Sequence, residues 1–167
     1  MGTIEFTRIA GANVIALDIN DNRLQFCKEK LKVEYIINPS KEDAYPRLKE
    51  ITNDDMPSVV IYATGNQNAI NNPLQYLAHG GRFVLIGLQK DEISFSHPEF
   101  HKRESALISS RNATIEDFVH VIDSMKKGLI DPTKYITHRV KFEGLKDVFE
   151  TWFDPSTGVI KAVVELD

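Results

Sequence analysis

The first residues suited to ligand chemistry stand at the end of an apolar run. Asn13–Asp18 reads NVIALD, an unbroken apolar segment that ends in an acid and is typical of a strand buried on both faces. At the carboxyl end of a strand in a parallel sheet, a carboxylate can accept hydrogen bonds from both ribose hydroxyls of adenosine and would repel an additional phosphate. Asn20 and Arg23 follow closely, and Arg23 could lie over the same ribose. The ordinary alternatives are that Asp18 caps the following helix and that Arg23 is a solvated charge.

Two further strand ends carry small turns. Ala63-Thr64-Gly65 follows the apolar segment SVVIYA, and Ile86-Gly87-Leu88 closes the segment RFVLIGL. A glycine turn lets the backbone come close to a flat ligand, adenine at the first turn and a nicotinamide ring at the second. A plain tight turn explains each position equally well. Three ligand-compatible strand ends in series nevertheless predict a dinucleotide site.

Other catalytic arrangements are not supported by the sequence. Cys27 falls on the apolar face of a predicted helix, which indicates core packing. His97 and His101 alone have ligand-like spacing, and Pro98 is expected to prevent a helix that carries both on one face. The sequence contains neither a G-x-S-x-G elbow nor a G-x-x-x-x-G-K-[ST] loop. We therefore predict no nucleophilic site and no metal site.

The composition bounds the class of protein. The 167 residues include 20 Lys and Arg against 24 Asp and Glu, for a net charge of −4, and 42% are hydrophobic. This balance argues against a nucleic-acid or anionic-membrane partner. No apolar run approaches the ~20 residues of a membrane span, and the N-terminus lacks a signal-peptide layout. The single cysteine excludes an intramolecular disulfide framework. We expect one cytoplasmic domain over residues 1–167.

Strands alternate with helices along most of the chain, which predicts an α/β fold built around a parallel sheet. Ser40 is the expected N-cap of the third helix, and Thr114-x-x-Asp117 marks the start of the fifth. Helices are expected over 2–10, 21–31, 41–51, 67–78, 114–127 and 144–153. Strands are expected over 13–18, 34–38, 58–63, 82–88, 93–96, 105–110, 137–142 and 159–166.

Taken in order, these segments resemble the cofactor-binding half of the zinc-type medium-chain alcohol and polyol dehydrogenases. The matching series covers nearly the whole chain and reads LDIN-x-x-R, YATGN, GGRFVLIGL, LISSRNA, YITHRVKFEGL and GVIKAVVELD. The resemblance implies a Rossmann-like, doubly wound and mostly parallel sheet. It also implies that the parent reaction is NAD-dependent oxidation of a secondary hydroxyl in a polyol, a sugar acid or a similar small alcohol.

The resemblance implies NAD as the cofactor rather than NADP, and it assigns its contacts along the chain. In that family an acid and a nearby basic residue hold the adenosine ribose, and a turn flanks the adenine. A loop and the end of the next strand approach the nicotinamide, and another basic residue approaches the pyrophosphate. In this sequence the corresponding residues are Asp18, Ile19, Asn20, Arg23, Ala63, Thr64, Gly65, Ile86, Gly87, Leu88, Ser110, Arg111 and Lys161. Ordinary surface charges are the alternative for Arg111 and Lys161.

The chain also departs from the family pattern. It contains no G-x-G-x-x-G, so we expect the first strand, the glycine loop and the zinc-bearing catalytic domain to be missing. Without the backbone donors of that loop, NAD affinity should fall from the micromolar toward the millimolar range. The missing strand is central in the family's sheet, so 13–17 and 58–62 are expected to pair directly or through a swapped neighbour.

Two single residues also differ from the family pattern. Lys32 stands where the family usually has glycine, and it would cost roughly 1 kcal/mol if its backbone is left-handed. Tyr62 occupies a position that is often acidic.

Partners and activity follow from the resemblance. The segment Glu92–Ser96 matches a strand that pairs with its two-fold mate, which implies a homodimer, and a hairpin within one chain is the alternative. The chain alone is expected to bind a dinucleotide without catalysing hydride transfer. The competing interpretation is a non-catalytic nucleotide-binding or assembly module. A third interpretation, an adenosylmethionine-dependent methyltransferase, does not account well for the segment LISSRNA.

Overall fold

The structure, a computed structural model, describes residues 1–65, 73–88, 90 and 92–166. The chain divides into two compact units. The first unit comprises Met1–Glu42 and Thr114–Asp167, and the second comprises Asp43–Ala113. Each unit has its own strands and helices and is described by itself.

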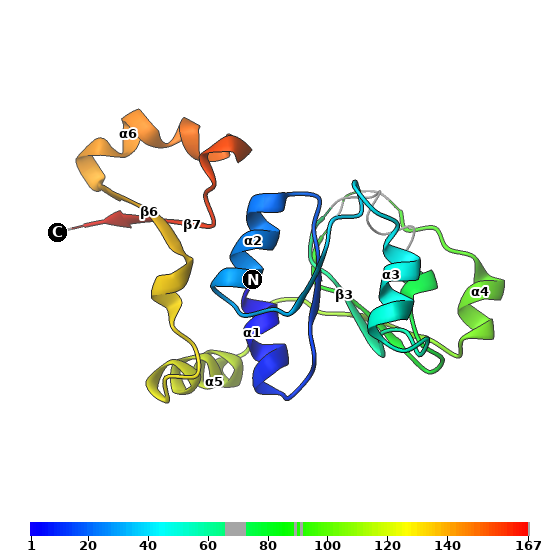
Figure 1. Ribbon diagram of the computed structural model, residues 1–167. Coiled ribbons are helices and arrows are strands. Elements are labelled where there is room, and N and C mark those ends of the chain that lie inside the picture. Colours follow the sequence, from blue (N-terminus) through cyan, green and yellow to red (C-terminus); the bar gives the residue numbers. More distant parts are fainter. Residues whose placement is uncertain (66–72, 89, 91, 167) are drawn as a thin grey trace. The chain divides into compact units, whose positions relative to one another are not determined.

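The first unit begins with two helix–strand pairs, whose helices are the blue ribbons α1 and α2 of Figure 1. The elements are α1 (Gly2–Ile9), β1 (Ile15–Leu17), α2 (Asp21–Glu29) and β2 (Tyr35–Ile37). Strands β1 and β2 are parallel, with Ile15 opposite Tyr35 and Leu17 opposite Ile37. Leu24, Cys27 and Leu31 lie buried against β1, which confirms the predicted helical face and the packing role of the cysteine.

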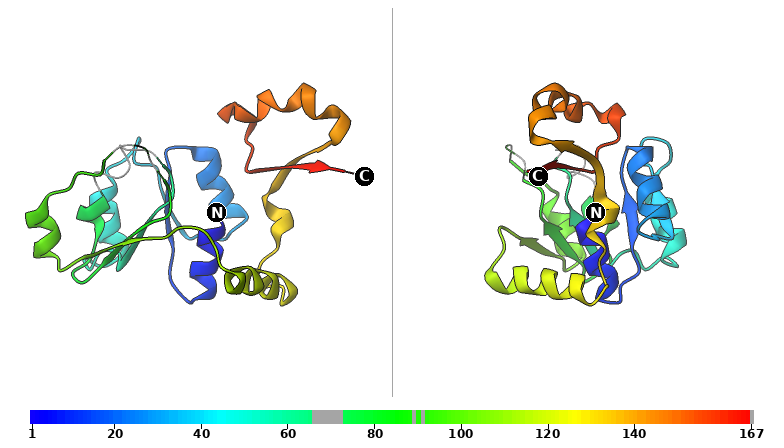
Figure 2. Two further views of the ribbon diagram at one scale, coloured as in Figure 1. Left: turned by 180° about the vertical axis from the view of Figure 1, so that it is seen from behind. Right: turned by 90° about the vertical axis from the view of Figure 1, so that its left-hand side faces the viewer.

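The remainder of the first unit is a long helix followed by a second parallel strand pair. Helix α5 (Ile115–Lys126) begins with the predicted capping box between Thr114 and Asp117. Strands β6 (Ile136–Lys141) and β7 (Lys161–Glu165) pair in parallel. Between them α6 (Leu145–Val148) and short 3-10 turns, rather than the single helix expected over 144–153, arch above the strands (Figure 2).

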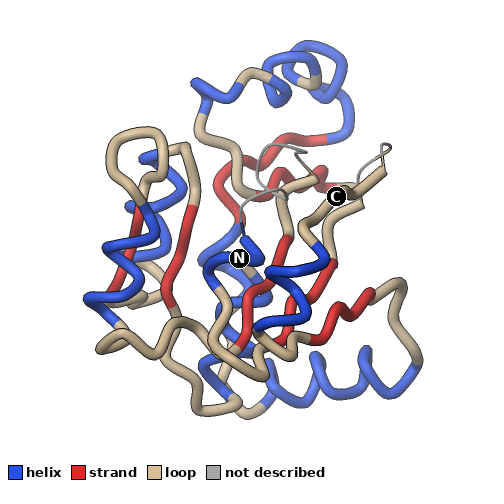
Figure 3. Tube along the Cα trace, turned by 90° about the vertical axis from the view of Figure 1, so that its right-hand side faces the viewer, coloured by secondary structure: helices blue, strands red, loops and turns tan. Residues whose placement is uncertain are grey.

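The second unit is built on a three-stranded parallel sheet in the order β3-β4-β5. Its elements are α3 (Ala44–Ile51), β3 (Val59–Tyr62), the 3-10 turn η2 (Pro73–Tyr76), β4 (Arg82–Leu85), α4 (His97–Lys102) and β5 (Ala106–Ser109), with strands drawn red in Figure 3. The core of this unit contains Tyr62, Leu77 and Phe83, which are at most 4% exposed. The parallel α/β class predicted from the sequence is confirmed.

Three local expectations need correction. Asp43 rather than Ser40 caps α3, because the Asp43 Oδ1 accepts from the Tyr45 N–H at 2.9 Å. Residues 67–72 of the expected fourth helix lie outside the described residues, and the part after them is a 3-10 turn. The described single chain forms no strand over 93–96, since no neighbouring strand supplies a ladder there.

Pro98 does not prevent a helix. It lies in the first turn of α4, where a proline loses no intrahelical hydrogen bond because the first N–H groups of a helix have no partner within it. The expectation that His97 and His101 could not share a helical face was therefore wrong, and the two rings lie 5.9 Å apart between centroids.

Strands β1 and β3 belong to separate sheets, so the expected direct pairing of 13–17 with 58–62 is not formed. Among the described residues, β1 pairs with β2 alone and β3 with β4 alone. Bridging by a neighbouring molecule remains a hypothesis about the chain in solution.

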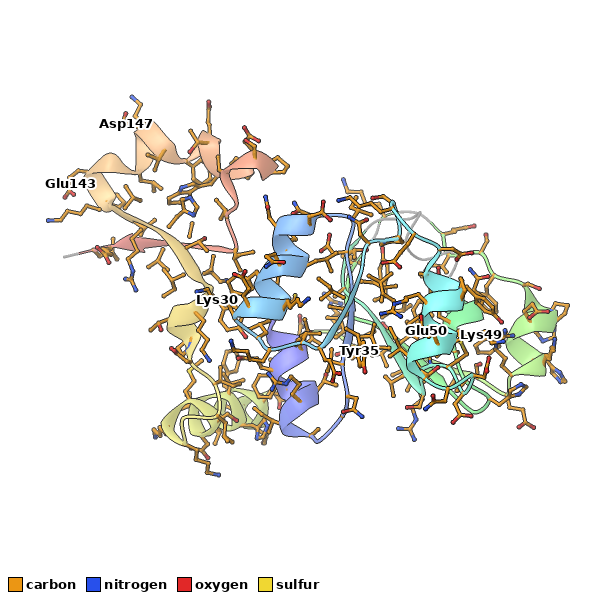
Figure 4. All side chains as sticks on the ribbon, viewed as in Figure 1. Lys30, Tyr35, Lys49, Glu50, Glu143 and Asp147 are labelled. Atoms are coloured by element: carbon orange, nitrogen blue, oxygen red, sulfur yellow. The ribbon has the colours of Figure 1, made fainter. Side chains whose placement is uncertain are left out.

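The backbone of Lys32 is left-handed, with φ of 56°. A side chain costs about 1 kcal/mol in this region, so Lys32→Gly should raise the free energy of unfolding by up to about 1 kcal/mol in urea denaturation. The matched control is Lys30→Gly at the end of α2, where φ is −93° (Figure 4). Glycine relieves no strain at that position, so the control should be neutral or destabilising. Equal effects of the two substitutions would contradict the assignment of strain to Lys32.

Candidate functional site

Asp18 lies directly after β1 with part of its carboxylate available to a ligand. Its Oδ1 accepts from the Asn20 N–H at 2.9 Å, and its Oδ2 lies 3.7 Å from the Arg23 guanidinium. The side chain of Asp18 is 25% exposed. The N-cap of α2 is Asn20, whose Oδ1 accepts from the N–H groups of Asn22 and Arg23. Asp18 is therefore not needed as the helix cap, which was the ordinary alternative.

The turn that carries Asp18 is fixed by the buried amide of Asn38. The Asn38 Nδ2 donates to the Ile19 carbonyl at 3.1 Å and to the Asp21 Oδ1 at 2.8 Å. The Asn38 Oδ1 accepts from the Ser40 N–H at 3.0 Å and from the Ser40 hydroxyl at 2.6 Å. Since the amide is 6% exposed and bonded on both ends, it joins the carboxyl end of β2 to that of β1.

Asp21 extends this network to the surface. Its Oδ2 pairs with the Lys41 ammonium at 2.5 Å, and both side chains are more than half exposed. The hydrogen bonds from Lys41 and then Asn38 hold the pKa of the Asp21 carboxyl below its ordinary value of 3.8. Two acid–base pairs, Asp18 with Arg23 and Asp21 with Lys41, thus flank the Asn20 cap.

Sequence reasoning missed Asn38, Asp21 and Lys41. Asn38 is followed by Pro39, and an Asn-Pro pair after an apolar run does indicate a turn, but it does not show which groups the amide bonds. The pairing of Asp21 with Lys41 depends on two strands being neighbours, which spacing along the chain does not show.

In the second unit, the two predicted glycine turns contact each other. The Tyr62 carbonyl accepts from the N–H groups of Ile86 and Gly87, both at 2.9 Å. A Cβ built on Gly87 would lie 2.9 Å from the Gly65 nitrogen, so only glycine allows this approach. Gly65 itself has a φ of +67°. The loops Ala63–Gly65 and Ile86–Leu88 therefore form one exposed backbone surface at the carboxyl edge of the sheet.

The other predicted contacts divide between the two units. The Ser110 N–H donates to the Leu85 carbonyl at 2.9 Å, which places Ser110 and the exposed Arg111 beside the end of β4. Lys161 opens β7, where its carbonyl accepts from the Thr137 hydroxyl at 3.4 Å. None of the contacts found among the described residues joins Lys161 to Asp18 or to Arg23, and its predicted role at the pyrophosphate stays a prediction.

Tyr62 stands at a position where the resemblance to the dehydrogenase family predicts an acidic residue, and its ring is part of the core. It is 4% exposed and packs with Leu77 and Phe83, which explains how this unit accepts an aromatic residue there. Within the described residues its hydroxyl has no hydrogen-bond partner.

The described residues do not fit a catalytic zinc. Across 1–65, 73–88, 90 and 92–166 there is no group of three or more His, Cys, Asp or Glu that could hold a metal ion. In the same ranges no helix is both long enough and apolar enough to cross a bilayer. The described side chains therefore do not by themselves supply the three protein ligands of a catalytic zinc.

The residues fit the adenosine end of a dinucleotide better than its pyrophosphate. A carboxylate beside an arginine supplies acceptors for ribose hydroxyls, and bare glycine backbone suits flat rings. The fingerprint loop that would supply pyrophosphate donors is not in the sequence. The fold itself belongs to the parallel α/β class.

A sequence model of the family described as zinc-binding dehydrogenase matches residues 1–127, and the chain belongs to this family. L-Galactonate-5-dehydrogenase of Escherichia coli (strain K12) is 36% identical over 164 residues, which are 98% of this chain and 48% of that protein.

Two solved structures share the fold. One is 2R,3R-butanediol dehydrogenase from Bacillus subtilis, with a TM-score of 0.86 and 20% identity. The other is an alcohol dehydrogenase from E. coli CFT073 complexed with the cofactor NADH, with a TM-score of 0.86 and 25% identity. Each match covers 98% of this chain, and it covers 47% and 48% of the two solved chains respectively. The Rossmann-like fold is thereby confirmed, and the chain spans about half the length of the relatives it matches.

The lowered pKa of Asp21 predicts a pH-dependent stability. A carboxyl whose pKa is lower in the folded state stabilises the protein above its unfolded pKa, and this stabilisation is lost as the pH falls through the folded pKa. The urea midpoint of the wild type should therefore exceed that of Asp21→Asn near neutral pH. The difference should shrink as the pH falls below the ordinary carboxyl pKa of 3.8, because the folded-state carboxyl then becomes protonated as well.

The matched control for this prediction is Asp147→Asn, an exposed acid on α6 (Figure 4). Asp147 lies in the connection between β6 and β7 and takes no part in the hydrogen bonds of Asn38. A difference between wild type and Asp21→Asn that does not change with pH would contradict the role of the Asp21 carboxylate.

Proposed function

We propose that this chain is the NAD-binding portion of a zinc-dependent dehydrogenase that oxidises a secondary hydroxyl of a polyol, sugar acid or similar alcohol. The observation that carries the proposal is the Asp18 carboxylate, which is partly exposed beside Arg23 and relieved of capping by Asn20. Membership of the zinc-binding dehydrogenase family and the sugar-acid relative support the reaction class. We also propose that residues 1–167 act as one dinucleotide-binding domain and that the protein is located in the cytoplasm.

The charge at Asp18 supports a preference for NAD over NADP. A carboxylate accepts hydrogen bonds from the 2′- and 3′-hydroxyls of the ribose, and it repels a 2′-phosphate. The nearby cations are both engaged with acids, Arg23 with Asp18 and Lys41 with Asp21. A 2′-phosphate would therefore have to compete with carboxylates for either cation.

A non-catalytic nucleotide-binding module is the second candidate. It agrees with the lack of a group of three metal ligands among the described residues, which the first candidate also expects. Both candidates predict nucleotide binding, and they differ in whether the bound NAD takes part in hydride transfer when a zinc-bearing domain is supplied.

The binding proposal is tested by titrating the ¹⁵N-labelled chain with NAD, because NMR detects millimolar affinity. We expect NAD to shift the resonances of Asp18–Arg23, of Ala63–Gly65 and of Ile86–Leu88, and NADP to do so more weakly. Asp18→Asn should weaken NAD binding about tenfold or more, since one charge-assisted hydrogen bond is worth roughly 1.5–3 kcal/mol. It should also narrow the preference for NAD over NADP.

Glu34→Gln, which removes an exposed charge just before β2, is the matched control and should leave NAD binding unchanged. The proposal is contradicted by a lack of NAD-dependent shifts at about 10 mM ligand, an affinity too weak for a cofactor site. If Asp18→Asn and Glu34→Gln weakened NAD binding equally, the effect of Asp18 would be one of net charge and not of a hydrogen bond to the ribose.

We also propose that Glu92–Ser96 pairs with its counterpart in a second copy. In the single chain this segment forms no strand, although Ile93 packs on the core of the second unit and the Phe95 and Phe100 rings lie 5.2 Å apart. These apolar contacts anchor the segment at the surface, where Glu92 and Ser94 are exposed.

Sedimentation at micromolar concentration should give a dimer, and Ser94→Pro should shift it toward the monomer because proline removes a donor and blocks edge pairing. The control Glu92→Gln should keep the dimer. A monomeric wild type would contradict the proposed association without bearing on NAD binding.

A further inference from the structure

Helix α4 presents two imidazoles to one side. His97 and His101 are four residues apart, which places them one turn from each other on the same helical face. Their ring centroids are 5.9 Å apart and the rings are nearly edge to face, with an interplanar angle of 68°. Because both residues belong to one short helix in the second unit, their spacing is fixed by local backbone geometry.

The helix that carries the two histidines is held by other residues. Ser96 caps it by accepting from the Glu99 N–H at 3.5 Å, and Pro98 fits the first turn. Arg103 pairs with Glu99 at 2.9 Å. The Phe100 ring packs against Phe95. The imidazoles are not used in these contacts, so the helix can form without them and leave them available to a ligand.

Both imidazoles open onto a surface hollow. His97 and His101 are exposed, and they line a concavity of about 490 Å³ together with Phe100, Lys102, Glu104 and Ser105. The hollow is wide enough for an ion that keeps several of its water molecules. Glu104 adds a negative charge at its rim, and Lys102 adds a positive one.

We propose that His97 and His101 bind one divalent transition-metal ion of the Zn²⁺, Ni²⁺ and Cu²⁺ class. Two histidines at positions i and i+4 of a helix are a recurrent chelating pair, and neutral imidazole is a preferred ligand of these ions. Mg²⁺ and Ca²⁺ select oxygen ligands and should be rejected. Since the described residues supply no third protein ligand, water completes the coordination shell. This proposal does not rest on the proposed function.

The test is calorimetric titration of the wild-type chain with NiCl₂ and with MgCl₂. We expect binding of one Ni²⁺ per chain and none of Mg²⁺. His97→Gln and His101→Gln should each weaken Ni²⁺ binding about tenfold or more, because a lost ligand costs at least as much affinity as a lost outer-shell partner. The matched control is His79→Gln, which removes a histidine of the same unit outside α4 and should leave the affinity unchanged.

A second readout separates ligand loss from misfolding. All variants should keep the wild-type circular dichroism, since the two imidazoles are exposed. Saturating Ni²⁺ should raise the melting temperature of the wild type and of His79→Gln but not of the α4 variants, because a ligand that binds only the folded state stabilises it. The inference is overturned if Ni²⁺ does not bind at about 1 mM. It is equally overturned if the α4 variants bind as tightly as the wild type, or if His79→Gln removes the binding.

Discussion

The buried side chain of Asn38 holds together the turns that follow β1 and β2, one of which carries the ribose contact that we propose for Asp18. Its amide group bonds the Ile19 carbonyl and the Asp21 carboxylate, which follow β1, and Ser40, which follows β2. A buried amide left without these partners would cost about 1–3 kcal/mol, so the turn and the amide hold each other in place. The position of Asp18 depends on this arrangement, because its own bond to the Asn20 N–H requires the same turn.

The two candidate binding regions, one in each unit, are built on different physical principles. Around Asp18 the structure relies on side-chain charge, with two acid–base pairs and a helix cap within a few residues. Around Gly87 it relies on the lack of a side chain, since a Cβ would collide with the backbone of the neighbouring turn. Under the proposed function, the first arrangement would bind a polar sugar and the second would admit a flat ring.

Much of this arrangement could be predicted because parallel α/β units have strong local patterns. The apolar runs that end at Asp18, Ala63 and Leu88 indicated strands, although the strands found there are only partly buried. The Thr114 box indicated a helix start. Prediction failed where local geometry or a distant partner decides the outcome. Pro98 was taken as a helix breaker although the first turn tolerates it. The hydrogen bonds of Asn38 depend on β2 lying beside β1, and the strand expected at 93–96 requires an edge that the single chain does not provide there.

Every ladder in the described residues joins strands that are consecutive along the chain: β1 with β2, β3 with β4, β4 with β5, and β6 with β7. Parallel pairing normally slows folding because the chain must close long loops before it gains contacts. Here each closure spans a single crossover, and no ladder has to wait for a segment synthesised much later. The contacts within each ladder are therefore close in sequence, which lowers the entropy lost in bringing its strands together.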